Sequence, residues 1–127
     1  MQWKLEYFST VSPYLIVRDA EAALEFLENV FGATRLSVHK REDGPGIAHE
    51  EARNDDSVVK MGEMPEAGEA NVHVYVSDAD AVFERAIHTG AQVVQDMTRS
   101  GDGDDCGGVA DGNGTVWWIL TQESYRG

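Results

Sequence analysis

The sequence is nearly free of cysteine, since Cys106 is the single one among 127 residues. One cysteine excludes a disulfide within the chain and a cysteine-rich zinc site, and a reducing compartment is its simplest setting. The first 31 residues also lack an uninterrupted apolar stretch, because charged side chains such as Lys4, Glu6 and Arg18 interrupt them. The sequence therefore predicts neither a signal peptide nor a membrane span, and we expect a cytoplasmic protein.

Basic residues are also scarce. The chain carries 10 Lys and Arg against 23 Asp and Glu, which gives a formal net charge of -13. Such a field repels phosphate backbones and anionic membrane surfaces, so we expect no nucleic acid and no membrane as partner. It favours cationic partners instead. The alternative interpretation is that the charge only maintains solubility or reflects a salty habitat, because net charge does not determine fold or function.

Apolar residues, by contrast, are plentiful, at 42% of the chain. A chain of this length buries about 65–70% of its unfolded surface on folding, which supports a core without disulfides or a structural metal. The length is too small for two large independent domains. We therefore expect residues 1–127 to form a single domain.

Two stretches of the chain share one pattern of side chains. A run of β-forming residues at 11–17 is followed by apolar side chains at helical spacing over residues 20–31. The same order returns from residue 71 onward, about 59 residues later. Matching N-caps and stop signals support the repeat, with Asp19 and Asp78 before the helices and Gly32 and Gly90 after them.

Three short β-like segments follow each predicted helix, so each half of the chain has the order β-α-β-β-β. The first module covers about residues 11–61 and the second about residues 71–122. Residues 62–70, which contain a proline and a glycine, form the linker between them. The fold class is therefore α+β, built from two tandem βαβββ modules.

Side chains alternate along these strands between a face that packs on the helix and an opposite, concave face. The concave face gathers aromatic and polar residues, although an ordinary solvent-exposed sheet face alternates in the same way. Aromatic rings suit a flat or apolar ligand, and charged groups orient it. The candidate site residues on this face are Tyr14, His49, Glu51, Arg53, Lys60, His73, Tyr75 and Trp118.

Four strings of the sequence carry a resemblance to a known family. SPYLIVRDAEAALEFLENVFGA and VHVYVSDADAVFERAIHTGA look like the opening strand and helix of its two modules. HEEARNDDSV and GDDCGGVADGNGTVWWILTQ look like its later strands. Together, over about residues 11–122, they resemble the PhnB-like branch of the vicinal oxygen chelate superfamily of glyoxalases, extradiol dioxygenases and bleomycin-resistance proteins. The resemblance implies an incompletely closed β-barrel with the helices outside.

In metal-dependent members of that superfamily, His or Glu side chains at four strand positions hold the cation. Carried over, those positions fall on Ser12, Lys60, Asn71 and Trp118. Lys60 is positively charged and the Trp118 indole offers only an N–H donor, so neither suits a divalent metal. The resemblance therefore implies that the usual metal site is absent, and we predict no cofactor.

Two interpretations of His49 and Glu51 stay open. In the first, His49 is a general base or a displaced metal ligand, Glu51 tunes it or serves as a second ligand, and His73 completes the site. In the second, the residues are a hydrogen-bonded lining of the face, with Glu51 paired to Arg53 or Lys60.

Three functional hypotheses follow. The first is a metal-independent protein that binds a small cationic or aromatic molecule in the barrel crevice. The alternative is a metal-dependent or acid–base enzyme of the lyase, isomerase or dioxygenase type, with His49 and Glu51 as catalytic residues and a divalent metal as a possible cofactor. The third is a protein of this fold whose ligand no general argument names. The resemblance implies a homodimer in each case, which also suits an incompletely closed barrel with edge strands to cover.

Overall fold

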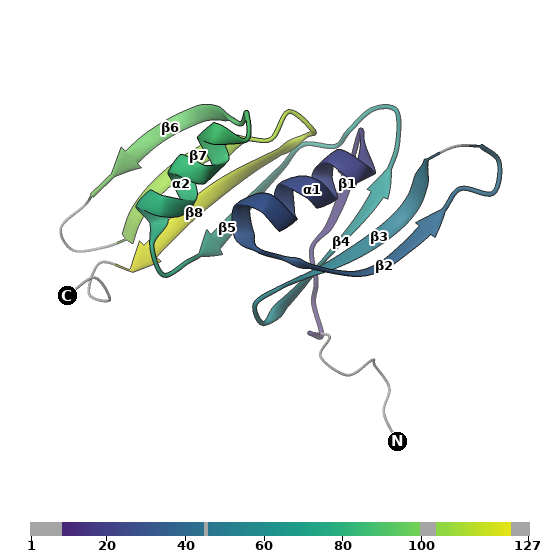
Figure 1. Ribbon diagram of the computed structural model, residues 1–127, viewed down its shortest axis with the longest axis horizontal. Coiled ribbons are helices and arrows are strands. Elements are labelled where there is room, and N and C mark those ends of the chain that lie inside the picture. The colour runs from purple at the N-terminus through teal and green to yellow at the C-terminus, as the bar shows by residue number, and fades with distance from the viewer. Residues whose placement is uncertain (1–8, 45, 100–103, 123–127) are drawn as a thin grey trace, which may run out of the picture. The chain divides into compact units, whose positions relative to one another are not determined.

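The computed structural model describes residues 9–44, 46–99 and 104–122. The chain divides into two compact units, with the boundary between Gly68 and Glu69. Figure 1 shows the elements in chain order. The first unit holds β1 (Tyr14–Val17), α1 (Ala20–Phe31), β2 (Thr34–Lys40), β3 (Ile47–Asn54) and β4 (Ser57–Glu63). The second unit holds β5 (Ala70–Tyr75), α2 (Ala79–His88), β6 (Gln92–Thr98), β7 (Asp104–Ala110) and β8 (Thr115–Gln122).

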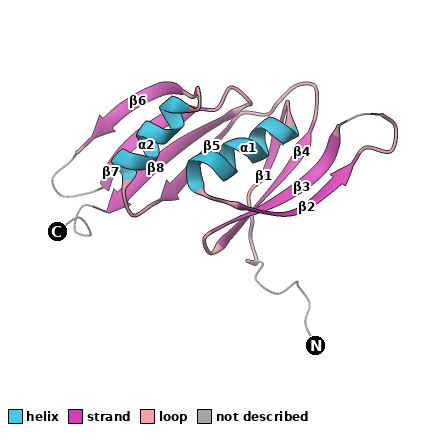
Figure 2. Cartoon of the chain, viewed as in Figure 1, coloured by secondary structure: helices cyan, strands magenta, loops and turns pink. Residues whose placement is uncertain are grey.

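Each unit contains a four-stranded mixed sheet of the same topology. The strand orders are β1-β4-β3-β2 and β5-β8-β7-β6, with the first strand of each unit parallel to the last and the other pairs antiparallel. One helix covers one face of each sheet (Figure 2). We call the other face the open face. These observations confirm the α+β fold of two βαβββ modules. Among the described residues, no helix is both long and apolar enough to cross a membrane.

Both helices begin and end where the sequence predicts. The Asp19 and Asp78 side chains accept hydrogen bonds from the third residue after each, at 3.1 Å in both helices. This contact satisfies one of the free N–H groups of the first turn. Gly32 ends α1 with φ of 73°, a left-handed conformation that favours glycine. In the second unit Thr89 caps the helix, and Gly90 follows with φ of 102°.

A second contact anchors each helix start to the last strand of its own unit. The Ala20 N–H donates to Glu63 Oε2 at 2.9 Å, and the Ala79 N–H donates to Thr121 Oγ1 at 2.8 Å. Glu63 is the last residue of β4, and Thr121 is the second-to-last residue of β8. The repeat therefore extends from the sequence pattern to the tertiary contacts, with a carboxylate in one unit and a hydroxyl in the other.

The core of the first unit contains a carboxyl group that the sequence analysis did not identify. Glu50 on β3 is fully buried at 0% exposure, and neither of its carboxyl oxygens has a hydrogen-bond partner among the described residues. It pairs with Met61 across the sheet, as Gly107 pairs with Ile119 in the second unit. A Cβ atom on Gly107 would lie 2.8 Å from the ring of Phe83. The Phe83 ring therefore occupies, in the second unit, the space that the Glu50 side chain takes in the first.

Burial sets the protonation of this group. The pKa of Glu50 rises to about 8, chiefly because burial removes water, with smaller increases from the negative charges of Glu21, Glu63 and Asp19 and an opposing effect of Arg35. A neutral carboxyl group is also the form that the apolar core tolerates best. Glu50 is therefore protonated at neutral pH.

Stability should fall as pH rises through the window set by Glu50. Between the ordinary pKa of 4.5 and about 8, the folded protein keeps a proton that the unfolded chain has lost. The contribution of this group to the unfolding free energy therefore decreases by up to about 1.4 kcal/mol per pH unit across that window and levels off above it. The unfolding free energy of Glu50→Gln, measured with denaturant at pH 5, 6.5 and 8, should not show this decrease.

The matched control is Glu25→Gln, because Glu25 lies on the exposed side of α1. It should leave the pH dependence of the wild-type protein unchanged. Equal pH dependence in Glu50→Gln and Glu25→Gln would show that Glu50 is not held neutral in the folded state.

Candidate functional site

A row of polar side chains crosses the open face of the first sheet. The strand register places Tyr14 beside Lys60, Lys60 beside Glu51, and Glu51 beside Ser37, one residue from each of the four strands. Tyr14, Lys60 and Glu51 are predicted site residues, and the register brings them together. Ser37 is an addition, and its short polar side chain gave no signal in the sequence.

Glu51 is the centre of this group. Its Oε1 accepts a hydrogen bond from Ser37 Oγ at 2.8 Å, and its Oε2 lies 3.5 Å from His49 Nε2 and 4.0 Å from Lys60 Nζ. Partial burial raises the pKa of Glu51, but the hydrogen bonds from Ser37 and His49 and the charges of His49 and Lys60 outweigh it, so the pKa falls below its ordinary value. Glu51 is therefore a carboxylate near neutral pH.

Tyr14 reaches His49 across β4. The two rings stack with centroids 5.5 Å apart and an interplanar angle of 27°, and the Tyr14 hydroxyl oxygen lies 3.4 Å from His49 Nδ1. Gly62 on β4 lies between them, paired with His49, and a Cβ atom there would lie 2.5 Å from the Tyr14 hydroxyl. A glycine at this position is what allows the contact. His39 adds a second imidazole, with its ring 5.6 Å from that of His49.

Arg53 lies further along β3, near the turn that joins β3 to β4. Its Nε donates to the carbonyl oxygen of Asp55 at 3.0 Å, and Asp55 has φ of 54°. That contact supports a strained turn residue. The second interpretation of the sequence paired Glu51 with Arg53 or Lys60. Of these two cations, Lys60 is the one that lies near Glu51.

The open face of the second sheet carries the other predicted residues. Trp118 Nε1 donates to Asn71 Oδ1 at 3.0 Å, and the His73 ring centroid lies 6.4 Å from that of Trp118. The Trp118 ring lies over Gly108, where a Cβ atom would lie 2.7 Å from it. Tyr75 is 66% exposed and donates its hydroxyl proton to Asp104 Oδ2 at 2.7 Å.

The four positions to which the resemblance assigns the family's metal ligands carry side chains that suit a divalent cation poorly. Asn71 Oδ1 accepts from the Trp118 indole, which has no acceptor to offer a metal. Lys60 brings a positive charge to its position, and Ser12 is a neutral hydroxyl. Over the residues that the structure describes, no group of three or more His, Cys, Asp or Glu side chains is placed to hold a metal ion.

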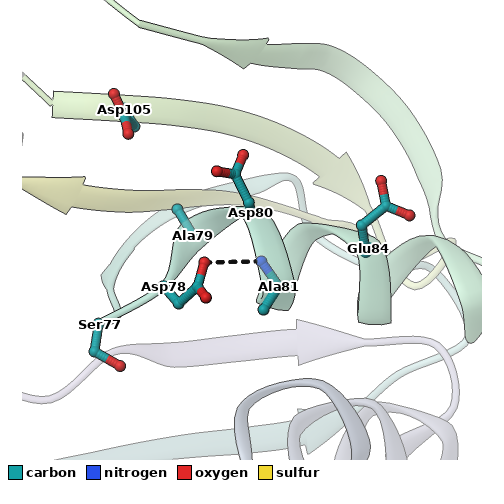
Figure 3. Close-up of a pocket in the computed structure, with 7 residues that line it drawn as sticks. All are labelled: Ser77, Asp78, Ala79, Asp80, Ala81, Glu84 and Asp105. Atoms are coloured by element: carbon teal, nitrogen blue, oxygen red, sulfur yellow. Dashed lines mark hydrogen bonds between the residues drawn. The ribbon is translucent and has the colours of Figure 1, made fainter. Parts of the chain in front are cut away.

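A hollow of about 570 Å³ lies elsewhere, at the start of α2 (Figure 3). It contains none of the predicted site residues. Three of its four acidic side chains already serve the fold, because Arg99 bridges Asp80 and Asp105 at 2.7 and 2.8 Å and Asp78 caps the helix. The residues that line it are Ser77, Asp78, Ala79, Asp80, Ala81, Glu84 and Asp105.

Known proteins share this fold and part of the sequence. The uncharacterized protein Mb0911c of Mycobacterium bovis is 32% identical over 120 residues, which span 84% of this chain and 79% of the relative. The crystal structure of TioX from Micromonospora sp. ML1 has a TM-score of 0.76 and 25% identity and covers 90% of this chain and 98% of its own.

Two more distant structures share the fold alone. A mutant of the fosfomycin resistance protein FosX from Listeria monocytogenes, complexed with Mn(II) and 1S,2S-dihydroxypropylphosphonic acid, has a TM-score of 0.73 and 16% identity and covers 99% of this chain and 98% of its own. A PhnB protein from Bacillus cereus has a TM-score of 0.68 and 14% identity and covers 89% of this chain and 99% of its own.

The match to a family profile agrees with the topology and with these neighbours, and it confirms the resemblance seen in the sequence. It covers residues 7–119, nearly the whole of both units. The chain belongs to the Glyoxalase/Bleomycin resistance protein/Dioxygenase superfamily.

Proposed function

We propose that this protein binds a small aromatic molecule, preferably a cationic one, on the open faces of its sheets and without a metal. The contact between Trp118 and Asn71 is the observation that carries the proposal, because it joins two of the family's metal positions to each other through a hydrogen bond of 3.0 Å. The remaining two positions hold Ser12 and Lys60, which add no anionic or imidazole ligand.

Metal analysis tests the first half of this proposal. Desalted, untagged protein is incubated with manganese, zinc, nickel or ferrous iron, desalted again and analysed for bound metal. We expect far less than one metal ion per chain in each case, because the four positions offer no carboxylate and no imidazole. About one metal per chain, or one per two chains, would contradict the proposal.

The ligand class follows from the side chains that the open faces present. Tyr14 and Tyr75 are 51% and 66% exposed, and Trp118 is half-buried, so flat apolar surface is available beside polar groups. The net charge of -13 attracts cations to any such surface. Ligand-binding roles for Arg53 and His73 belong to the same proposal.

A dye titration tests the ligand class. Ethidium, a cationic planar dye, should bind saturably, and anilinonaphthalene sulfonate, an anionic dye, should bind more weakly at equal ionic strength. Trp118→Ala should weaken ethidium binding about tenfold, because loss of one aromatic contact costs about 1–1.5 kcal/mol.

Ile87→Ala is the matched control, since Ile87 is an exposed apolar residue on α2 and not on an open face. It should bind ethidium like the wild-type protein. Equal affinities of Trp118→Ala and Ile87→Ala, or tighter binding of the anionic dye, would exclude Trp118 or the cationic ligand class from the proposal.

A second candidate function is acid–base catalysis by His49 and Glu51, in an enzyme of the lyase or isomerase type. The distance of 3.5 Å between His49 Nε2 and Glu51 Oε2 favours it, because a carboxylate that orients an imidazole is a recurrent arrangement of general bases. This candidate allows a divalent metal such as the Mn(II) of the FosX complex, but only at a site other than the four usual positions. Turnover that depends on pH and disappears in His49→Gln would support it.

We also propose that the protein is a cytoplasmic homodimer. Each sheet has edge strands, and β2 and β6 are edge strands of the first and second sheet. The exposed fractions of their apolar residues Leu36, Val93 and Val94 are 43%, 40% and 50%. An exposed apolar edge strand offers unpaired backbone groups to another chain, and pairing with a second copy is one way to cover it. Light scattering at micromolar concentration distinguishes a dimer from a monomer.

A further inference from the structure

Tyr14 differs from the other described tyrosine, Tyr75, in what its hydroxyl contacts. Its neighbour is an imidazole nitrogen, His49 Nδ1 at 3.4 Å, whereas the hydroxyl of Tyr75 contacts a carboxylate, Asp104 Oδ2 at 2.7 Å. The side chain of Tyr14 is half exposed, so small molecules in solution reach it. None of the functions considered above gives Tyr14 more than a contact role.

The direction of the hydrogen bonds around His49 follows from the chemistry of its two neighbours. A carboxylate oxygen only accepts, so the His49 Nε2 that faces Glu51 carries the proton. In the neutral imidazole, Nδ1 is then an acceptor, and the Tyr14 hydroxyl donates to it. Ser37 donates to the other carboxylate oxygen of Glu51, and Lys60 Nζ lies 4.0 Å from the oxygen that faces His49, so both contacts help to fix the carboxylate. A chain of three groups therefore leads from a fixed carboxylate through an imidazole to an exposed hydroxyl.

Carboxylate, imidazole and hydroxyl in this order form the arrangement that activates hydroxyl nucleophiles in general. The carboxylate fixes the tautomer of the imidazole and stabilises the imidazolium that forms when the hydroxyl loses its proton. The distances of 3.4 Å and 3.5 Å are at the long end of hydrogen bonds, as is common for such groups before a reactant binds.

We propose that the Tyr14 hydroxyl is a reactive site that takes an activated electrophile of the acyl or sulfonyl type, with His49 as the proton acceptor and Glu51 as the positioning residue. In the step, the Tyr14 oxygen forms a bond to the electrophilic centre and the leaving group departs with the electron pair of the bond that breaks. The hydroxyl proton moves to His49 Nδ1. No oxidant, reductant or metal takes part.

Tyr14 lies on the open face of the first sheet and Trp118 on the open face of the second, so the reaction at Tyr14 does not depend on Trp118 or on ethidium binding. A failed dye titration with rapid reaction at Tyr14 would remove the binding proposal only. Saturable ethidium binding without rapid reaction at Tyr14 would remove only the proposal of a reactive hydroxyl.

Phenyl fluorosulfate, a sulfonyl-type electrophile, is the probe, because the phenol oxygen attacks its sulfur, the S–F bond breaks with loss of fluoride, and the diaryl sulfate product is stable. The full-length protein is treated with the probe, digested at several times and mapped by mass spectrometry. Tyr75 is an internal reference in the same molecule, being more exposed than Tyr14. The Asp104 carboxylate that accepts its proton raises the pKa of Tyr75, which keeps it a phenol.

We expect Tyr14 to react at least about tenfold faster than Tyr75. His49→Gln should slow the reaction at Tyr14 on the order of 100-fold, the lower end of what a positioned general base contributes, and leave the rate at Tyr75 unchanged. Glu51→Gln should slow Tyr14 less and shift its pH profile, because the amide no longer stabilises the imidazolium. Equal rates at the two tyrosines, or an unchanged Tyr14 rate in folded His49→Gln, would overturn the proposal.

The pH dependence of the wild-type protein gives a test that needs no variant to fold. If His49 accepts the proton, the rate at Tyr14 does not require the phenolate and shows a plateau below the pH range in which phenols ionise. The rate at Tyr75 keeps rising with pH, because it follows the phenolate alone. Parallel pH profiles for the two residues would contradict the role of His49.

Discussion

The register between β3 and β4 is the constraint on which the first unit depends. It pairs Glu51 with Lys60 and His49 with Gly62, and it turns Glu50, between them in sequence, toward the helix. Because side chains alternate along a strand, a slip of one residue would bury Glu51 and expose Glu50. The neutral acid in the core and the carboxylate of the open face are therefore two results of one alignment, and the two pKa values move in opposite directions for that reason.

Much of the fold follows from local signals in the sequence. Asp19 and Asp78 predict the helix starts because capping acts within three residues, and the β-α-β-β-β order repeats visibly along the chain. Local signals do not predict which side chains meet across neighbouring strands. Ser37 joins Glu51 only because β2 pairs with β3, and Gly62 matters only because Tyr14 crosses β4. These roles arise from register, which no single segment encodes.

The candidate site was predicted in composition more than in arrangement. The alternation of side chains placed Tyr14, His49, Glu51 and Lys60 on one face, and the structure connects them within 3.4 to 4.0 Å. The sequence left open which cation lies near Glu51, because Arg53 and Lys60 have the same charge. Strand pairing places Lys60 there, opposite Glu51 on β4. The overall charge of -13 describes the surface as a whole and did not identify this local group of donors.

The proposed activation of the Tyr14 hydroxyl depends most directly on the tautomer of His49. Nitrogen-15 NMR of the histidine rings in the wild-type protein, with His49→Gln to assign the signal, reports which ring nitrogen carries the proton. At a pH where the ring is neutral, we expect the proton on Nε2, facing Glu51, and Nδ1 as an acceptor for Tyr14. A proton on Nδ1, or rapid exchange between the two forms, would contradict the proposed order of carboxylate, imidazole and hydroxyl.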